Sequence, residues 1–333
     1  MVRSVVLVLF ALCGAWAAKP LDIHFIDVEG GQSTLIVSPR GESLLVDTGW
    51  PGFNGRDADR IVKTAKKAGV KKIDYLLITH YHTDHVGGIT QLLDRMPVTT
   101  IIYHGKNTET GKAAADLQEA LDKALTKAKP MIVKPGDAIP LKGVDIKVIS
   151  ARGDLIQAAL PGAGQPNPHC AGQPVKEEDK TENGKSIGFL LTFGKFRMLD
   201  LADLTWNLET ELVCPANKLG TVDLYLTDHH GLAQSNPPAL VHGVRPRAIV
   251  MNNGAKKGGD PGAWRMMKAS PGLEDFWQMH YAVNGGKEHN VDDPFIANLE
   301  TPGGHNIKVS AETTGAFRVS NLRNKFEKSY SAR

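Results

Sequence analysis

The stretch Tyr75-Leu-Leu-Ile-Thr-His-Tyr-His-Thr-Asp-His-Val-Gly-Gly88 decides how the rest of the chain is interpreted. Its apolar first four residues predict a buried strand. Four side chains that bind metal ions follow within six positions, namely His80, His82, Asp84 and His85. Imidazole nitrogens and carboxylate oxygens are ligands that Zn2+ prefers. An irregular turn at the strand end lets His80 and His82 converge on one ion. The same turn lets Asp84 and His85 converge on a second, so the stretch predicts a metal-binding loop.

Histidine is scarce in this chain, with 12 among 333 residues, and this argues against accidental surface polarity at one strand end. Residues 79–88 resemble the HxHxDH signature of the metallo-β-lactamase superfamily. This signature is specific for the superfamily and carries little information on the substrate. The resemblance implies an α/β (α+β) fold, the four-layer αβ/βα sandwich of that superfamily, with the active site on the rim between two sheets.

The order of the expected elements also indicates two packed mixed sheets, because strands come first and then alternate with helices in two successive halves. Expected strands cover residues 21–28, 33–38, 43–46, 98–103 and 144–150, and then 186–193, 196–199, 222–226 and 248–251. Expected helices cover residues 57–68, 88–95, 112–127 and 273–279. Residues 307–311 and 316–320 predict a terminal hairpin.

The domain organisation follows from these elements. Residues 18–323 are expected to form one hydrolase domain, with residues 258–323 as a C-terminal extension beyond the shared motifs. Residues 151–184 are rich in glycine and proline and predict a long loop at the active site. Residues 324–333 are expected to be a flexible tail.

Residues 1–17 have the features of a secretory signal peptide. Arg3 supplies a positive start, an apolar core too short to span a bilayer follows, and Ala15-Trp16-Ala17 is a cleavage site. The protein is therefore expected to be exported to the periplasm or the extracellular space, without stable membrane insertion. Cleavage removes Cys13 and leaves Cys170 and Cys214. In an oxidising compartment this pair indicates a disulfide, and the alternative is two buried free thiols.

The charge balance gives no strong indication of a nucleic-acid or membrane partner, because the formal net charge is only +3. Nucleic acid is considered only as a substrate. The adjacent lysines are interpreted as solvated faces; they are the pairs Lys66-Lys67, Lys71-Lys72 and Lys256-Lys257.

Further residues of the site follow from the resemblance. Asp47, at the end of an expected strand, is expected to accept a hydrogen bond from the free ring N–H of a ligand histidine. Asp203, preferred over Asp200, matches the acid that bridges two metal ions. His230 precedes Gly231 and would complete the second metal site with Asp84 and His85. His229 is then free to protonate a leaving group or to hold an anionic substrate, although the roles of the two histidines could be exchanged.

A third ligand for the first metal is not evident. The superfamily has a histidine between the metal-binding loop and Asp203, and here that region contains only His104 and His169. His169 is the better placed candidate. The alternative is a first metal held by His80, His82, water and the bridging Asp203.

Asn183 and Ser186 before a strand, together with His229-His230-Gly231, resemble the hydrolase domain of ComEC-like competence proteins and of phosphorylcholine esterases. We therefore expect a secreted hydrolase that uses two divalent metal ions, Zn2+ or alternatively Mn2+, with Asp84 and His229 as catalytic residues. The expected substrate is a phosphodiester or another small molecule. One alternative is a lactonase or β-lactamase that acts on a carbonyl, and another is a non-catalytic metal-binding protein.

Overall fold

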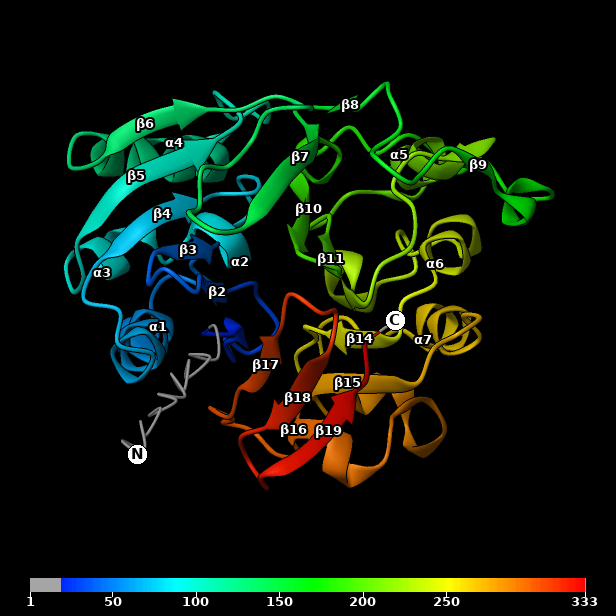
Figure 1. Cartoon of the computed structure of the whole chain (residues 1–333). Helices are drawn as coiled ribbons and strands as arrows, with labels where there is room; N and C mark the ends of the chain where they lie inside the picture. Colours follow the sequence, from blue (N-terminus) through cyan, green and yellow to red (C-terminus); the bar gives the residue numbers. More distant parts are fainter. Residues whose placement is uncertain (1–18, 333) are drawn as a thin grey trace, which may run out of the picture.

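The computed structural model describes residues 19–332 (Figure 1). The signal peptide predicted for residues 1–17 lies outside the described residues. Within residues 19–332, no helix is long and apolar enough to cross a membrane.

Two large sheets form the centre of the molecule (Figure 1). The nine-stranded sheet has the order β19-β18-β17-β1-β2-β3-β4-β5-β6. Its strands are β1 (Leu21–Phe25), β2 (Thr34–Val37), β3 (Ser43–Val46), β4 (Ile73–Leu77), β5 (Val98–Tyr103), β6 (Lys129–Ile132), β17 (Ile307–Ala311), β18 (Phe317–Asn321) and β19 (Phe326–Tyr330).

The eight-stranded sheet has the order β16-β15-β14-β13-β11-β10-β7-β8. Its strands are β7 (Asp145–Ala151), β8 (Asp154–Leu155), β10 (Gly188–Phe193), β11 (Phe196–Asp200), β13 (Leu224–Leu226), β14 (Ala248–Met251), β15 (Asp275–His280) and β16 (Ile296–Asn298). A separate pair joins β9 (Gln165–Pro166) to β12 (Ala216–Asn217).

Helices cover the outer face of each sheet. Those on the nine-stranded sheet are α1 (Arg56–Lys67), α3 (Ile89–Leu93) and α4 (Lys112–Leu125), and the short α2 (Thr83–Val86) follows the metal-binding loop. Those on the eight-stranded sheet are α5 (Trp206–Val213), α6 (Pro238–Val244) and α7 (Pro261–Lys268). The four-layer sandwich expected from the sequence is confirmed.

Alternation along the strands explains the layers, because successive side chains point to opposite faces of a sheet. In β3, Leu44 and Val46 belong to the core between the two sheets, whereas Leu45 packs under the helices. In β10, Leu191 faces the same central core and Leu190 faces the helices on the other side. Both sheets are therefore covered on two faces, which leaves their rims as the exposed polar edges.

The parallel strands bring polar residues to one rim. β3, β4, β5 and β6 run parallel, as do β11, β13, β14, β15 and β16. Each of β4, β11 and β13 is followed directly by a segment that holds candidate ligands. Because the carboxyl ends of parallel strands meet at one edge, these segments converge there.

Two segments have a structure other than the one expected for them, and the elements α5, α6, α7, β6 and β16 were not expected from the sequence. A helix was expected at residues 273–279, but β15 forms a parallel strand between β14 and β16, and all of its residues are buried. Trp277 faces the core between the sheets and Phe276 faces the helices. Such a short apolar run does not distinguish a helix from a fully buried strand.

The flexible tail expected at residues 324–333 was also wrong, because β19 extends the nine-stranded sheet by pairing with β18. Tyr330 anchors this strand: its hydroxyl accepts from Trp277 Nε1 at 3.1 Å and donates to Asp275 Oδ2 at 2.8 Å. The partners lie more than 50 residues earlier in the chain, so the composition of the tail does not reveal them.

The long segment at residues 151–184 is tied to the eight-stranded sheet. It contains β8, β9 and two short 3-10 helices, η2 (Pro168–Cys170) and η3 (Glu182–Lys185). Cys170 and Cys214 form a disulfide with an S–S distance of 2.07 Å, which confirms the predicted pairing.

Candidate metal centre

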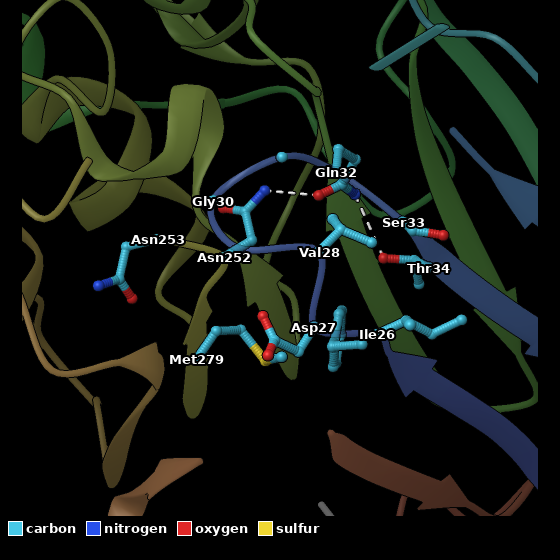
Figure 2. A pocket seen from close by; sticks show the side chains of 12 residues that line it. Ile26, Asp27, Val28, Gly30, Gln32, Ser33, Thr34, Asn252, Asn253 and Met279 are labelled. Carbon is cyan, nitrogen blue, oxygen red and sulfur yellow. Dashed lines mark hydrogen bonds between the residues drawn. The ribbon is translucent and has the colours of Figure 1, made fainter. Parts of the chain in front are cut away.

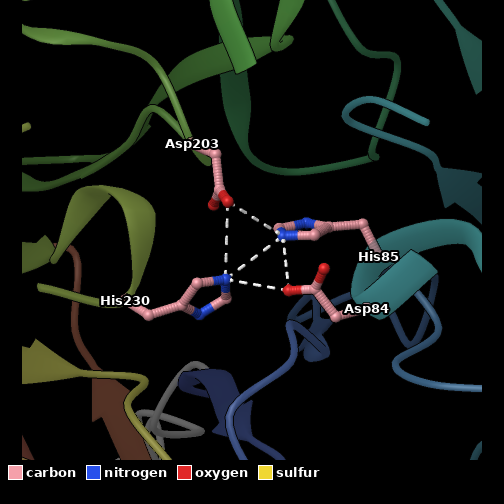
Figure 3. Close-up of side chains that lie close together, drawn as sticks. All are labelled: Asp84, His85, Asp203 and His230. Atoms are coloured by element: carbon pink, nitrogen blue, oxygen red, sulfur yellow. Dashed lines mark hydrogen bonds and ion pairs between the residues drawn. The ribbon is translucent and has the colours of Figure 1, made fainter. Parts of the chain in front are cut away.

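Four predicted ligands form a buried group, which consists of Asp84, His85, Asp203 and His230 (Figure 3). Their candidate ligand atoms lie within 4.8 Å of one another. Nε2 of His230 is 3.1 Å from Asp84 Oδ2, and Nε2 of His85 is 3.3 Å from both Asp84 Oδ2 and Asp203 Oδ2. Three segments thus meet at one point, although they lie far apart in sequence. They are the metal-binding loop, the segment after β11 and the segment after β13.

An open group lies beside it and consists of His80, His82 and Asp203. His80 Nε2 is 3.1 Å from His82 Nδ1 and 3.9 Å from Asp203 Oδ2. The side chain of His82 is 28% exposed, whereas those of His85 and His230 are 0% exposed. Asp203 belongs to both groups, and its role as a bridging carboxylate stays a prediction.

The buried group fits a divalent cation. Nε2 of His85 and Nε2 of His230 are 3.3 Å apart, and two lone pairs at that distance repel unless a proton or a cation lies between them. Oδ1 of Asp203 is buried and has no hydrogen-bond partner among the described residues. Nitrogen and oxygen donors arranged in this way are a typical zinc ligand set.

The electrostatics of the buried group point the same way. Burial alone would lower the pKa of His85, but three aspartates, Asp203 foremost, raise this pKa well above its ordinary value. Burial would raise the pKa of Asp84 and of Asp203, but the nearby imidazoles, first among them His85, hold both well below the usual range. The group therefore attracts positive charge.

Asp47 supports His85 from behind. Its Oδ2 is 2.7 Å from His85 Nδ1, and it also accepts hydrogen bonds from Thr79 N at 2.9 Å and Thr79 Oγ1 at 2.7 Å. A histidine that donates through Nδ1 presents the lone pair of Nε2 to the group. Asp47 thus makes the contact with a histidine that the sequence predicted, and its role in supporting a metal ligand stays a prediction.

His229 and His230 point to different places. Both have positive φ, 50° and 54°, in the 3-10 turn η4 (Asp228–Gly231), and their ring centroids are 6.3 Å apart. His230 joins the buried group, whereas His229 lies at its edge with Nε2 3.7 Å from Asp203 Oδ2. His229 Nδ1 has no hydrogen-bond partner among residues 19–332.

His169 does not join either group. It lies in η2, where its ring packs edge-on against His242 with centroids 5.2 Å apart. His104, the other histidine considered, pairs with Glu182 through Nε2 at 2.9 Å. The structure thus gives no support to His169 as a third ligand, because η2 is held on the helical side of the eight-stranded sheet by the disulfide.

Two functional candidates escaped the sequence analysis. Oε1 of Glu109, in the turn between β5 and α4, is 3.1 Å from Nε2 of His82. Lys257, interpreted from the sequence as part of a solvated face, instead forms an ion pair with Asp84 and lies 5.1 Å from the ring centre of Trp50. Its neighbour Lys256 is exposed. No local pattern marks either residue, because each reaches its partner only in the folded chain.

A glycine turn between β1 and β2 contacts the metal-binding loop through Asp84, and Figure 2 shows this turn beside Asn252. Gln32 donates from its backbone to Asp84 O at 3.0 Å, and its side chain accepts from Asn252 Nδ2 at 2.5 Å. A Cβ on Gly31 would lie 2.6 Å from Asp84 O, so glycine is needed for this approach. The turn therefore links the metal-binding loop to the segment after β14.

Another cluster of potential ligands, formed by Asp27, Glu29 and His280, already contains a cation. Arg60 lies 3.1 Å from Asp27 Oδ2 and 3.0 Å from Glu29 Oε1, and His280 Nε2 is 2.7 Å from Asp27 Oδ1. We interpret this cluster as an internal ion-pair network that joins β1, α1 and β15.

Part of the chain is similar to known proteins. The family model described as "Metallo-beta-lactamase superfamily" matches residues 26–181. ComE operon protein 3 of Bacillus subtilis is 23% identical over 251 residues, which cover 70% of this chain and 28% of that protein. A UPF0173 metal-dependent hydrolase of Staphylococcus saprophyticus is 34% identical over 71 residues, 21% of this chain and 28% of that protein.

Among solved structures, the metallo-beta-lactamase fold protein YhfI of Bacillus subtilis aligns with a TM-score of 0.48 and 15% identity, over 78% of this chain and 96% of that one. The chain covers between 27% and 37% of the length of the curated relatives that it matches.

Proposed function

We propose that the protein is a metal-dependent hydrolase that cleaves phosphodiesters at the buried and open groups, on the premise that residues 26–181 match the metallo-beta-lactamase superfamily model. The observation that carries the proposal is the pair of ligand groups that share Asp203. Asp84, His85, Asp203 and His230 would hold one ion, and His80, His82 and Asp203 the other. Zn2+ suits these ligands, and Mn2+ is the alternative.

Divalent ions bound there would activate a water molecule for attack and stabilise the negative charge that develops on the substrate. Asp47 keeps His85 in one orientation through its hydrogen bond. His229 faces the centre through Nε2, which lies 3.7 Å from Asp203 Oδ2, and this nitrogen would contact a substrate or leaving-group oxygen.

Lys257 favours a phosphodiester over a carbonyl substrate. Its ammonium group lies beside Asp84 at the edge of the buried group, and its side chain is 32% exposed. A phosphodiester carries a negative charge before and after attack, whereas a lactone is neutral. A fixed cation beside the reacting centre therefore contributes more to binding the phosphodiester.

A substrate panel tests this proposal. Metal-replete protein is assayed with bis(p-nitrophenyl) phosphate, p-nitrophenyl phosphate, a lactone and a chromogenic β-lactam, and metal-stripped protein is the control. We expect the highest kcat/KM for the diester and none without metal. A higher kcat/KM for the lactone or the β-lactam would overturn the substrate class, and no metal-dependent turnover of any substrate would overturn the hydrolase.

Variants at the lysine pair sharpen this test. Lys257→Ala should raise KM for the diester by about tenfold, about 1.4 kcal/mol, while leaving KM for the lactone near wild type. Lys256→Ala removes the neighbouring exposed charge and should leave both KM values unchanged. Equal effects of the two variants would show that only the overall charge matters.

We further propose that the protein is exported. The signal-peptide features of residues 1–17 and the disulfide between Cys170 and Cys214 support this, because disulfides persist in oxidising compartments. Cell fractionation with N-terminal sequencing tests it: the mature chain should begin near Ala18 outside the cytoplasm, and an uncleaved cytoplasmic chain would overturn the proposal.

A further inference from the structure

We propose that Glu109 is a positioning residue of the metal centre, which orients His82 and selects the ring tautomer that presents Nδ1 to the ion of the open group. This inference rests on the proposed metal centre but not on the substrate class. It would explain how the open group functions with two histidines.

The two ring nitrogens of His82 face different partners. Nδ1 is 3.1 Å from Nε2 of His80, on the side of the open group, and Nε2 is 3.1 Å from Oε1 of Glu109. A carboxylate accepts hydrogen bonds and donates none, so Nε2 of His82 carries the proton. Nδ1 then keeps its lone pair and is directed at the same point as the lone pair of His80 Nε2.

Glu109 is itself held in place by a network. Its Oε1 accepts from Glu182 N at 3.0 Å, and its own backbone N–H donates to Asn107 Oδ1 at 2.9 Å. The side chain is 33% exposed. Its Oε1 thus lies between two protein donors, Glu182 N and His82 Nε2.

Glu182 connects this network to the metal-binding loop. Its carboxylate is fully buried and accepts from Thr108 N at 2.6 Å, His104 Nε2 at 2.9 Å and Tyr81 N at 3.3 Å. Burial alone would raise the pKa of Glu182, but hydrogen bonds from His104 and Thr108 lower it to about 2. The charged carboxylate thus fastens the turn that contains Glu109 to the residue next to His82.

The buried group shows the same relation between a carboxylate and a ligand histidine. There Asp47 contacts Nδ1 of His85, so that Nε2 is the free nitrogen, and here Glu109 contacts Nε2 of His82, so that Nδ1 is free. The two supporting carboxylates come from different segments, the end of β3 and the turn after β5. Each group therefore has one histidine oriented by an acid.

The test compares Glu109→Ala, Glu109→Gln and the control Glu119→Ala, which removes an exposed carboxylate of α4. Metal content and the dissociation constant of each ion are measured by elemental analysis and chelator competition. We expect Glu109→Ala to weaken the affinity for one of the two ions by about 10- to 100-fold and to leave the affinity for the other ion unchanged. Glu109→Gln keeps an oxygen acceptor and should lose less affinity for this ion. Glu119→Ala should bind both ions as tightly as wild type does.

A spectroscopic measurement separates orientation from general stability. Ring 15N resonances of His82 in the zinc-loaded protein should show a protonated Nε2 and a metal-bound Nδ1 in wild type and in Glu109→Gln. Unchanged affinity for both ions in a folded Glu109→Ala, or a protonated Nδ1 in wild type, would overturn the proposal. Equal losses in the Ala and Gln variants would make Glu109 a direct ligand and would also overturn it. A wild type that binds no metal would instead overturn the proposed function.

Discussion

The buried and open groups share Asp203, yet they differ in the burial of their histidines and in the segments that supply them. The histidines of the buried group, His85 and His230, come from two different sheets and are both fully buried. The open group takes both of its histidines from one loop, and one of them, His82, is 28% exposed. Ligands that the fold orders in advance bind an ion at a lower entropic cost. We therefore expect the buried group to bind an ion more tightly than the open group does.

The largest effect is expected where the groups meet. Asp203→Asn preserves the shape of the side chain but removes the charge that both groups share. The binding of both ions should therefore be weaker. We expect kcat/KM for the diester to fall by at least about 10³-fold, or about 4 kcal/mol, together with the metal content. Elemental analysis and steady-state kinetics measure the two quantities.

The matched control is Asp200→Asn. Asp200 is buried in the same segment, and burial raises its pKa to about 7, so a neutral amide resembles a form that it already populates. This variant should keep its metal. If Asp200→Asn lost metal while Asp203→Asn retained it, the bridging role would belong to Asp200.

Variants that remove a single ligand distinguish the two groups. His82→Ala should lose the open-group ion and keep the other, and His230→Ala should lose the buried-group ion. With a coloured chelator, wild type should release its metal in a fast and a slow phase. His82→Ala should retain only the slow phase. A single phase in wild type, unchanged by His82→Ala, would contradict the difference between the groups.

A smaller effect is expected at the edge of the buried group. His229→Ala should lower the rate by about 10²-fold, the lower end of the range for acid–base catalysis, while the metal content stays near wild type, because a hydrogen-bonding group is lost but no ligand is. His230→Ala serves as the comparison, since it should lower both quantities. Metal lost only from the His229 variant would exchange the roles of the two histidines.

The smallest effect concerns the support beneath His229 and His230. Glu209 and Asp228 are both buried, and burial raises the pKa of Glu209 to about 7 and that of Asp228 well above its ordinary value. A carboxyl whose pKa is raised by folding stabilises the protein below its unfolded pKa of 4.5 and loses that contribution as pH rises through about 7.

Glu209→Gln removes this titration. Its Tm should therefore exceed that of wild type by about 2–5 °C at pH 8 and by less at pH 5, measured by calorimetry at constant excess metal. Glu211→Gln, at an exposed position of α5, should follow wild type at both pH values. Parallel Tm curves for wild type and Glu209→Gln would show that the pair does not titrate in this range.

Much of the fold was predictable because the evidence for it was local. Strand alternation identified most strands, and the predicted boundaries of β14 and β5 agree with the structure. The two wrong assignments, at β15 and β19, concern short segments whose state depends on neighbours elsewhere in the chain. β15 is a strand because it lies between β14 and β16, and β19 is ordered because Tyr330 contacts Trp277 and Asp275.

The candidate site divides in the same way. The sequence by itself predicted that the loop at residues 80–85, Asp47, Asp203 and His230 meet in space, because each follows a strand and parallel strands bring their ends to one rim. Only the tertiary structure decided that His169 lies apart from the centre and that Glu109 and Lys257 reach it. Glu109 lies 27 residues from His82 and Lys257 lies 173 from Asp84. Contacts at such separations depend on how the layers pack, which no local pattern encodes.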